Sequence, residues 1–204
     1  KGGFVSMRKL EDGSESPYEL NSTYYSALSD PKDETLGEAR FLCSQSVALA
    51  MRGIPAVYFH SICATSNDLK GVKETGRNRT INRKKWECAE LEKLLEEKEG
   101  QALRVFEWYA RILRRRAACP AFHPDAPQEI LDFGPSIFAL ERASLDGSQV
   151  VLCLFNFQGN DTGVPDSERL QTLFPHGKAR DLISGGEVVF QKGEFALRPY
   201  QALW

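Results

Sequence analysis

The chain has 204 residues, of which 42% are hydrophobic and 26% charged. This size and composition predict a globular protein with one large or two small domains, and they argue against a disordered one. Lys and Arg total 26 against 28 Asp and Glu, so the formal net charge is −2, and the protein has no overall field that would attract nucleic acid or an anionic membrane.

The cysteines and the N-terminus indicate a cytoplasmic location. The cysteines are an odd number, are widely spaced and include no CxxC pair, so we expect buried small hydrophobes rather than disulfides or a zinc site. They are Cys43, Cys63, Cys88, Cys119 and Cys153. No apolar run approaches the ~20 residues of a membrane span, and the N-terminus lacks a signal-peptide pattern. The chain begins with Lys rather than Met, so we expect a fragment or a processed chain, and we expect no cofactor.

The first third of the chain predicts a long loop, a helix and a short strand. Residues 1–34 are rich in Gly, Ser, Pro, Asp and Tyr without periodicity, which indicates a long ordered loop of the kind that carries function. From Thr35 to Gly53, small and apolar residues recur at spacings of three and four, which predicts a helix. The run IPAVYF at 54–59 has the length and composition of a buried parallel strand.

Two helices are predicted after a second polar loop at 60–84. The first is charged and amphipathic and covers 86–100, and the second ends in three arginines at 114–116. Cations in a last turn favour the helix dipole, so we prefer a solvated helix end to a nucleic-acid patch there. The buried side of the second helix is expected to contain Leu103, Phe106, Ala110 and Leu113.

From about residue 119 the pattern changes to short β-rich runs separated by FGP, DGS, GND and SGG turns, which predicts an antiparallel β domain without further helices. We therefore divide the chain into an α/β part, 1–118, and an all-β part, 119–204. The first part contains one predicted parallel strand, which cannot form a closed sheet without further strands.

Three segments, in this order, carry a resemblance to a known family. They are SPYELNSTYYSAL at 16–28, GIPAVYFHSICATSNDLKGV at 53–72 and GRNRTINRKKW at 76–86. The chain resembles the sucrose phosphorylase group of the α-amylase superfamily, glycoside hydrolase family 13, and within it the glucosylglycerate phosphorylase and sucrose 6-phosphate phosphorylase branch. The resemblance covers essentially the whole chain and corresponds to the C-terminal portion of such enzymes.

The resemblance implies the last units of a (β/α)8 TIM barrel followed by an antiparallel β domain. Residues 1–34 would be the loop after strand seven, 54–59 strand eight, and 60–84 the loop after it, so both loops would lie at the catalytic face of the barrel. The missing N-terminal half of the barrel, a sugar substrate and inorganic phosphate are then the implied partners. Neither nucleic acid nor a membrane is implied.

Such enzymes cleave an α-glucoside in two displacements with retention, through an aspartate nucleophile and a glutamic acid. A phosphorylase uses phosphate as the second nucleophile and releases α-glucose 1-phosphate. The chain contains no Arg-Leu-Asp triplet and no His-Asp pair, which are the places of the family nucleophile and third carboxylate. We therefore expect no catalytic residue in this chain and assign it the phosphate and acceptor side of the pocket.

The arginine-rich stretch GRNRTINR at 76–83 is the local cationic cluster of this nearly neutral chain. A guanidinium can bind two phosphate oxygens at once. By resemblance, Arg79 matches the arginine that contacts phosphate and Tyr18 the tyrosine turned toward the same subsite. Arg77 either assists or only holds the loop by pairing with Asp68 or Glu74. Asn82 and Arg83 are expected to make structural hydrogen bonds.

Three further positions bear on the acceptor. Asn67 and Asp68 could line the acceptor subsite or could simply form a turn. Glu19 stands where typical sucrose phosphorylases have Gln, and a carboxylate would repel phosphate unless an arginine pairs with it. This favours glucosylglycerate or a phosphorylated sucrose over sucrose. The alternatives to a phosphorylase are a non-catalytic carbohydrate- or phosphate-binding module and an α-glucoside hydrolase of the same superfamily.

Overall fold

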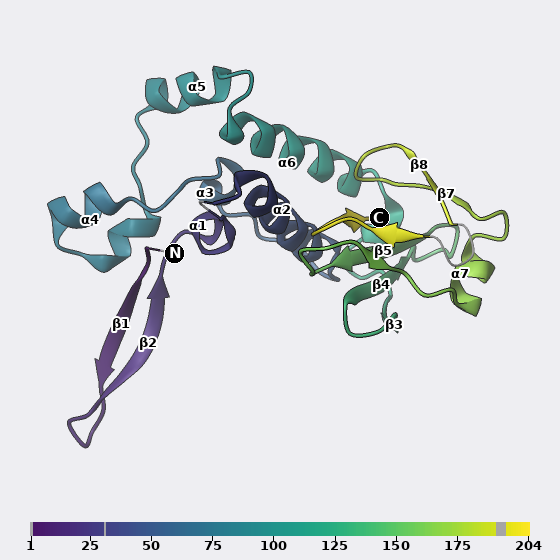
Figure 1. Cartoon of the computed structure of the whole chain (residues 1–204), viewed down its shortest axis with the longest axis horizontal. Helices are drawn as coiled ribbons and strands as arrows, with labels where there is room; N and C mark the ends of the chain where they lie inside the picture. The colour runs from purple at the N-terminus through teal and green to yellow at the C-terminus, as the bar shows by residue number, and fades with distance from the viewer. Residues whose placement is uncertain (1, 31, 191–194) are drawn as a thin grey trace. The chain divides into compact units, whose positions relative to one another are not determined.

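The structure is a computed structural model that describes residues 2–30, 32–190 and 195–204. The chain divides into two compact units, residues 1–30 with 57–109 and residues 31–56 with 110–204. Figure 1 shows their elements, and the last of the three boundaries between them, after residue 109, falls within α6 (Gln101–Ala117). The division into 1–118 and 119–204 that the sequence pattern suggests stays a prediction.

The first unit begins with a hairpin where a loop was predicted. Strands β1 (Phe4–Lys9) and β2 (Glu15–Asn21) pair antiparallel, with a register shift between Ser6 and Met7 (Figure 1). The turn is closed by the Leu10 N–H, which donates to the Ser14 carbonyl at 2.8 Å. The loop prediction was wrong because most side chains of both strands are exposed, so no alternation of apolar and polar residues marks them.

The rest of the first unit is built from short helices joined by extended chain. Residues 60–84 are not one loop, because they include most of α3 and all of α4 and η1. The elements are α1 (Tyr24–Leu28), α3 (Phe59–Ile62), α4 (Leu69–Thr75), the 3₁₀ helix η1 (Asn78–Asn82) and α5 (Cys88–Glu96). The predicted charged helix is thus confirmed over a shorter range. Cys88 is exposed at its start, unlike the other four cysteines, which are buried as expected.

Residues 54–59 do not form the predicted strand. Residues 54–58 are irregular, and no strand pairs with them within the described ranges. Ile54 is 85% exposed and Tyr58 55% exposed. A parallel strand is held by neighbours on both sides, and the described part of the chain supplies none here, so the apolar side chains stay at the surface.

The second unit packs helix α2 and α7 with antiparallel sheets. α2 (Glu34–Ala50) agrees with the predicted helix and is capped by Asp33, whose carboxylate accepts from the Leu36 N–H at 2.9 Å. The main sheet has the order β10-β5-β4-β3 and is antiparallel throughout. Its strands are β3 (Gln128–Asp132), β4 (Ile137–Ala143), β5 (Val150–Asn156) and β10 (Ala202–Leu203). The predicted antiparallel β region is therefore confirmed.

Smaller elements complete this unit. The short pairs are β6 (Thr162–Gly163) with β9 (Ala196–Leu197) and β7 (Lys178–Arg180) with β8 (Glu187–Val189), and η2 (Pro120–Phe122) precedes β3. The helix α7 (Glu168–Leu173) was not predicted, because six residues with one buried leucine give no measurable periodicity. Arg169 of α7 binds Glu141 of β4 through both its Nε and Nη2 atoms.

The buried face of α6 was predicted wrongly. Phe106 is 40% exposed, whereas Ala102, Val105, Trp108, Tyr109 and Ile112 are buried. Both faces carry apolar residues at helical spacing, so periodicity alone does not choose between them. Trp108 and Trp204 are core residues, whereas Trp86 is only half-buried and precedes α5. Within the described residues, no helix has the length and apolar character needed to cross a membrane.

Gly53, which follows α2, gives a test of backbone strain. Its φ is +110°, and an added Cβ would meet nothing within 4 Å. We expect Gly53→Ala to lower the free energy of unfolding by about 1–3 kcal/mol, because an L-residue is strained at this φ. Gly163→Ala is the matched control, since Gly163 also has open space but no positive φ. Equal urea midpoints for the two variants would contradict the expectation.

Candidate functional site

Two segments of the first unit bring Tyr18, Glu19 and Arg79 together. Tyr18 and Glu19 lie on β2, and Arg79 lies on η1. η1 follows Gly76, whose φ of +66° ends α4 in the left-handed region. Ile81, fully buried, anchors η1 from within, and its carbonyl accepts from the Asp68 N–H at 2.9 Å. The arginine is thus presented by a short, anchored turn.

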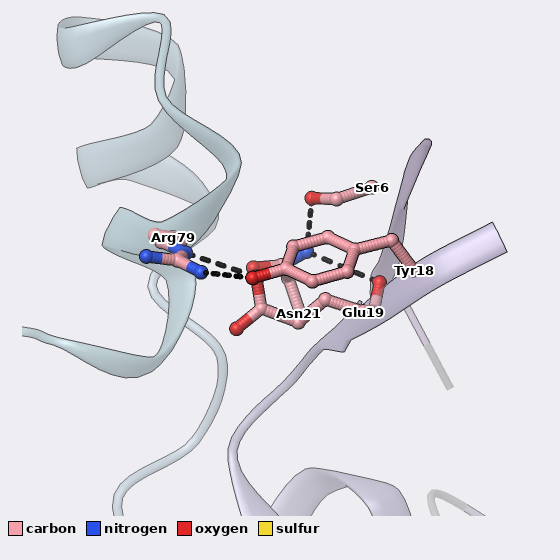
Figure 2. Close-up of polar contacts among 5 residues, drawn as sticks. All are labelled: Ser6, Tyr18, Glu19, Asn21 and Arg79. Atoms are coloured by element: carbon pink, nitrogen blue, oxygen red, sulfur yellow. Dashed lines mark hydrogen bonds and ion pairs between the residues drawn. The ribbon is translucent and has the colours of Figure 1, made fainter. Parts of the chain in front are cut away.

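The guanidinium of Arg79 is held by two partners (Figure 2). Its Nε donates to Glu19 Oε2 at 2.9 Å and its Nη2 to the Tyr18 hydroxyl at 3.2 Å. The hydrogen bond and charge of Glu19, with a smaller contribution from Tyr18, raise the pKa of Arg79 above its usual value. The side chains of Arg79 and Glu19 are 50% and 34% exposed, so this is a solvated ion pair that contributes little to stability.

Arg79 keeps free hydrogen-bonding capacity. An arginine carries five N–H donors, and the two bonds in Figure 2 leave three of them available on Nη1 and Nη2. One terminal nitrogen points away from Tyr18 and Glu19 in this view. The arrangement orients the guanidinium and still leaves N–H donors unused. Binding of an oxyanion requires both.

Arg79 also lines a shallow hollow of about 770 Å³ next to α4. Four cationic side chains line it against two carboxylates: Arg77, Arg79, Arg83 and Lys85 against Asp68 and Glu74. Glu74 pairs with Lys70 at 3.8 Å. Among the residues that the structure describes, the side chain of Arg77 forms no ion pair, so the alternative pairing with Asp68 or Glu74 is not found. The hollow is therefore cationic.

Asn67 and Asp68 have structural partners. The Asn67 side-chain oxygen accepts from the Thr23 N–H at 2.7 Å and from the Ser22 hydroxyl at 3.2 Å, which ties this turn to the start of α1. Asp68 caps α4 by accepting from the Gly71 N–H at 2.8 Å. These contacts agree with the turn alternative, and a role in acceptor binding stays a prediction.

Asn82 and Arg83 follow η1. The Asn82 carbonyl accepts from the Tyr58 hydroxyl at 3.1 Å, and the Arg83 N–H donates to the Thr80 carbonyl at 3.0 Å. Both bonds are made by main-chain atoms of Asn82 and Arg83, so the expected structural hydrogen bonds of their side chains stay a prediction, and Arg83 is exposed in the hollow.

A second concavity of about 490 Å³ lies at the base of the hairpin, and the sequence analysis did not identify it. Its lining combines apolar side chains with the polar residues Asn21, Ser22, Thr23, His60, Ser61 and Asn82. In the sequence His60 is followed by Ser61 and so forms no His-Asp pair. A single histidine after an apolar run carries no further sequence signal, so only the structure places it in the same concavity as Asn21.

Comparison with known proteins gives the following similarities. No protein-family model matches the chain. The chain is 38% identical to the glucosylglycerate phosphorylase of Allomeiothermus silvanus over 206 aligned positions, which cover all of this chain and 34% of that protein. It is 34% identical to the glucosylglycerate phosphorylase of Escherichia coli, again over all of this chain and 35% of that protein.

A solved structure shows a similar fold. The crystal structure of sucrose 6F-phosphate phosphorylase from Thermoanaerobacter thermosaccharolyticum matches with a TM-score of 0.58 and 26% identity, over 76% of this chain and 28% of that one. The chain spans about a third of the length of the curated relatives it matches.

Proposed function

Because the chain is homologous to the C-terminal portion of glucosylglycerate and sucrose phosphorylases, we propose that it is the phosphate-binding part of a retaining glycoside phosphorylase. The complete enzyme would convert an α-glucoside and inorganic phosphate into α-glucose 1-phosphate. The remainder of the barrel would supply the nucleophile and the general acid, and this chain would supply the anion site and the terminal β domain.

The observation that carries the proposal is the convergence of Tyr18 and Arg79. The two side chains are 61 positions apart in sequence and meet at 3.2 Å. Their meeting is what the family resemblance requires of the two loops. Phosphate must exchange its bonds to water for bonds to the protein, and a pre-oriented guanidinium with free N–H groups reduces the cost of that exchange.

Glu19 is compatible with an anion site because its charge is paired. Its carboxylate lies 2.9 Å from the Arg79 Nε, so it orients the arginine while cancelling part of its field. The net attraction for an anion then depends on the other cations of the hollow, namely Arg77, Arg83 and Lys85. Such a hollow suits an anionic leaving group as well as phosphate, and we favour glucosylglycerate as the substrate over neutral sucrose.

The exposed apolar run at 54–59 supports the place of this chain in a barrel. Ile54 and Tyr58 would be covered by neighbouring strands if the run became barrel strand eight, and the hairpin and 60–84 would then flank the catalytic face. Burying these side chains would also remove the apolar surface that the described structure leaves in contact with water.

The test is phosphorolysis by the complete protein against glucosylglycerate, sucrose 6-phosphate and sucrose. We expect phosphate-dependent release of glucose 1-phosphate, with the highest kcat/KM for glucosylglycerate. Release of free glucose at a rate independent of phosphate would identify a hydrolase instead. Saturable binding of sugar or phosphate without turnover of any of the three donors would identify a binding module.

A further inference from the structure

The anion site is shared between two segments that have to be held at a fixed distance. Glu19 lies on β2 and Arg79 on η1, 60 positions apart in sequence. Their ion pair is solvated, so it contributes little to holding β2 against η1. A binding group works well only when it is held within about 0.5 Å of its productive position. We therefore looked for contacts in the first unit that set the distance between β2 and η1.

Asn67 binds the segment that leaves β2. Its Oδ1 accepts from the Thr23 N–H at 2.7 Å and from the Ser22 hydroxyl at 3.2 Å. Its own N–H donates to the Ser26 hydroxyl at 2.9 Å. β2 ends at Asn21, and Ser26 lies in the first turn of α1, so these bonds all reach the junction of β2 with α1. One residue thus fixes the position at which the strand ends.

The next residue, Asp68, binds η1. Its N–H donates to the carbonyl of buried Ile81 at 2.9 Å, and its carboxylate caps α4 by accepting from the Gly71 N–H at 2.8 Å. A Cβ at Gly71 would lie 2.2 Å from an Asp68 carboxylate oxygen and 2.9 Å from the Thr80 methyl group, so only a glycine allows this close approach of α4. The neighbours Asn67 and Asp68 therefore connect the end of β2 to η1.

Two observations favour a positioning role of Asn67 over contact with a ligand. An amide oxygen has two lone pairs, and the Asn67 Oδ1 already accepts two hydrogen bonds. Thr23 is only 3% exposed, so its N–H would lose its partner in a buried place without Asn67, which is costly. A displacement there reaches the site directly, because Ser22 follows Glu19 by three residues and Ile81 follows Arg79 by two.

We propose that Asn67 is a positioning residue of the anion site. Together with Asp68, it sets the distance between β2 and η1. At that distance Tyr18 and Glu19 orient the Arg79 guanidinium toward the entering anion. The identity of this anion as phosphate rests on the proposed function, whereas the placement of Arg79 by Asn67 does not. Asn67 acts on the anion through Arg79 and does not touch the substrate itself.

The kinetic test uses the complete protein. Asn67→Ala should raise the KM for phosphate about 3- to 10-fold, as for loss of one or two neutral hydrogen bonds, and should leave the KM for the glucosyl donor nearly unchanged. In an Arg79→Ala background the same substitution should have no further effect on the KM for phosphate, because the group that Asn67 positions is absent. Equal rises in the two KM values, or the same effect with and without Arg79, would overturn the inference.

Ser167→Ala is the matched control for a general loss of stability. It removes the side-chain cap of α7 in the second unit, where Ser167 accepts from the Leu170 N–H at 3.2 Å. Loss of a cap typically lowers the free energy of unfolding, but Ser167 contacts neither β2 nor η1. Both KM values should therefore stay as in the parent enzyme. A rise in the KM for phosphate as large as that of Asn67→Ala would show that the effect is not specific to Asn67.

A second measurement needs no turnover and uses the 204-residue chain. NMR follows exchange of the Arg79 Nε–H with water, and Arg79→Lys assigns the signal. Because this N–H donates to Glu19, we expect Asn67→Ala to accelerate its exchange about 3- to 10-fold. Asn67→Asp keeps an acceptor oxygen and should retain slow exchange. If Asn67→Ala does not fold, Ser26→Ala removes only the bond from the Asn67 N–H and should accelerate exchange to a smaller extent.

The two measurements separate this inference from the proposed function. Unchanged exchange of the Arg79 Nε–H in the folded variants would overturn the role of Asn67, even if the complete protein catalyses phosphorolysis. Faster exchange in Asn67→Ala, with no phosphorolysis by the complete protein, would support the role of Asn67 and contradict only the proposed function.

Discussion

Replacing Arg79 with Ala in the complete enzyme should raise the KM for phosphate roughly 100-fold while changing the KM for the glucosyl donor much less. The variant removes up to two charge-assisted hydrogen bonds to phosphate, each of which contributes about 1.5–3 kcal/mol. It also removes the cation that lies 2.9 Å from the Glu19 carboxylate, so an unpaired negative charge then faces the entering anion. Initial rates of glucose 1-phosphate release at varied phosphate and varied donor measure the two constants separately.

Matched variants show whether the rise in the KM for phosphate depends on the planar guanidinium of Arg79 or only on its charge. Arg79→Lys retains a positive charge but not a planar pair of donors, so it should recover only part of the phosphate affinity. Arg111→Ala removes an exposed arginine of α6 outside the site and should leave both constants unchanged. If Arg79→Ala raised the two KM values equally, Arg79 would bind the glucoside and phosphate alike, and its assigned role would be wrong.

The parts of the fold that the sequence predicted are those with a strong local pattern. α2 has both helical spacing and a capping aspartate, and β4 and β5 are apolar runs bounded by turn residues. The hairpin was missed because its strands are solvated on both faces, which removes the signal on which strand prediction depends. The composition of the run at 54–59 predicted a strand, but a strand forms only where another strand can pair with it.

The candidate site likewise contains residues that the sequence identified and residues that only the structure identifies. Tyr18 and Arg79 were singled out through a family resemblance, whereas the residue types alone would not have joined positions 61 apart. The pairing of Glu19 with Arg79 depends on the register of the hairpin and the turn of η1, both of which are set by tertiary structure. His60 could not have been predicted, since Thr65, which contacts its ring, and Trp86, which donates to Thr65, come together only in the folded chain.

The largest expected effect on stability comes from Arg142, a cation in the middle of β4. Its side chain is fully buried, and its partners are backbone carbonyls rather than carboxylates. It donates to the carbonyls of Ala50 at 2.8 Å, His123 at 2.9 Å and Pro127 at 3.2 Å. Ala50 is the last residue of α2, so the guanidinium satisfies a free carbonyl at a helix C-terminus, where positive charge is favoured.

Arg142→Met should lower the free energy of unfolding by about 4 kcal/mol, because it removes the charge-assisted hydrogen bonds to these backbone carbonyls and leaves the buried Ala50 carbonyl without a donor. Urea unfolding of the chain, followed by tryptophan fluorescence, gives the midpoint and the slope, and an unchanged slope shows that the change lies in stability. If the variant does not fold, Arg142→Lys keeps the charge and three donors and should show an intermediate loss.

Arg116→Met provides a graded comparison for the same helix end. Arg116 donates to the carbonyls of Leu49 at 2.8 Å and Gly53 at 3.0 Å, and it is only partly buried. Its loss should therefore cost about 1–2 kcal/mol, and exposed Arg111→Met should cost less than about 0.5 kcal/mol. The order Arg142, Arg116, Arg111 follows from the number of carbonyls bound and their burial. A loss for Arg142→Met no larger than that for Arg111→Met would mean that water replaces the guanidinium, and that the C-terminus of α2 does not depend on this arginine.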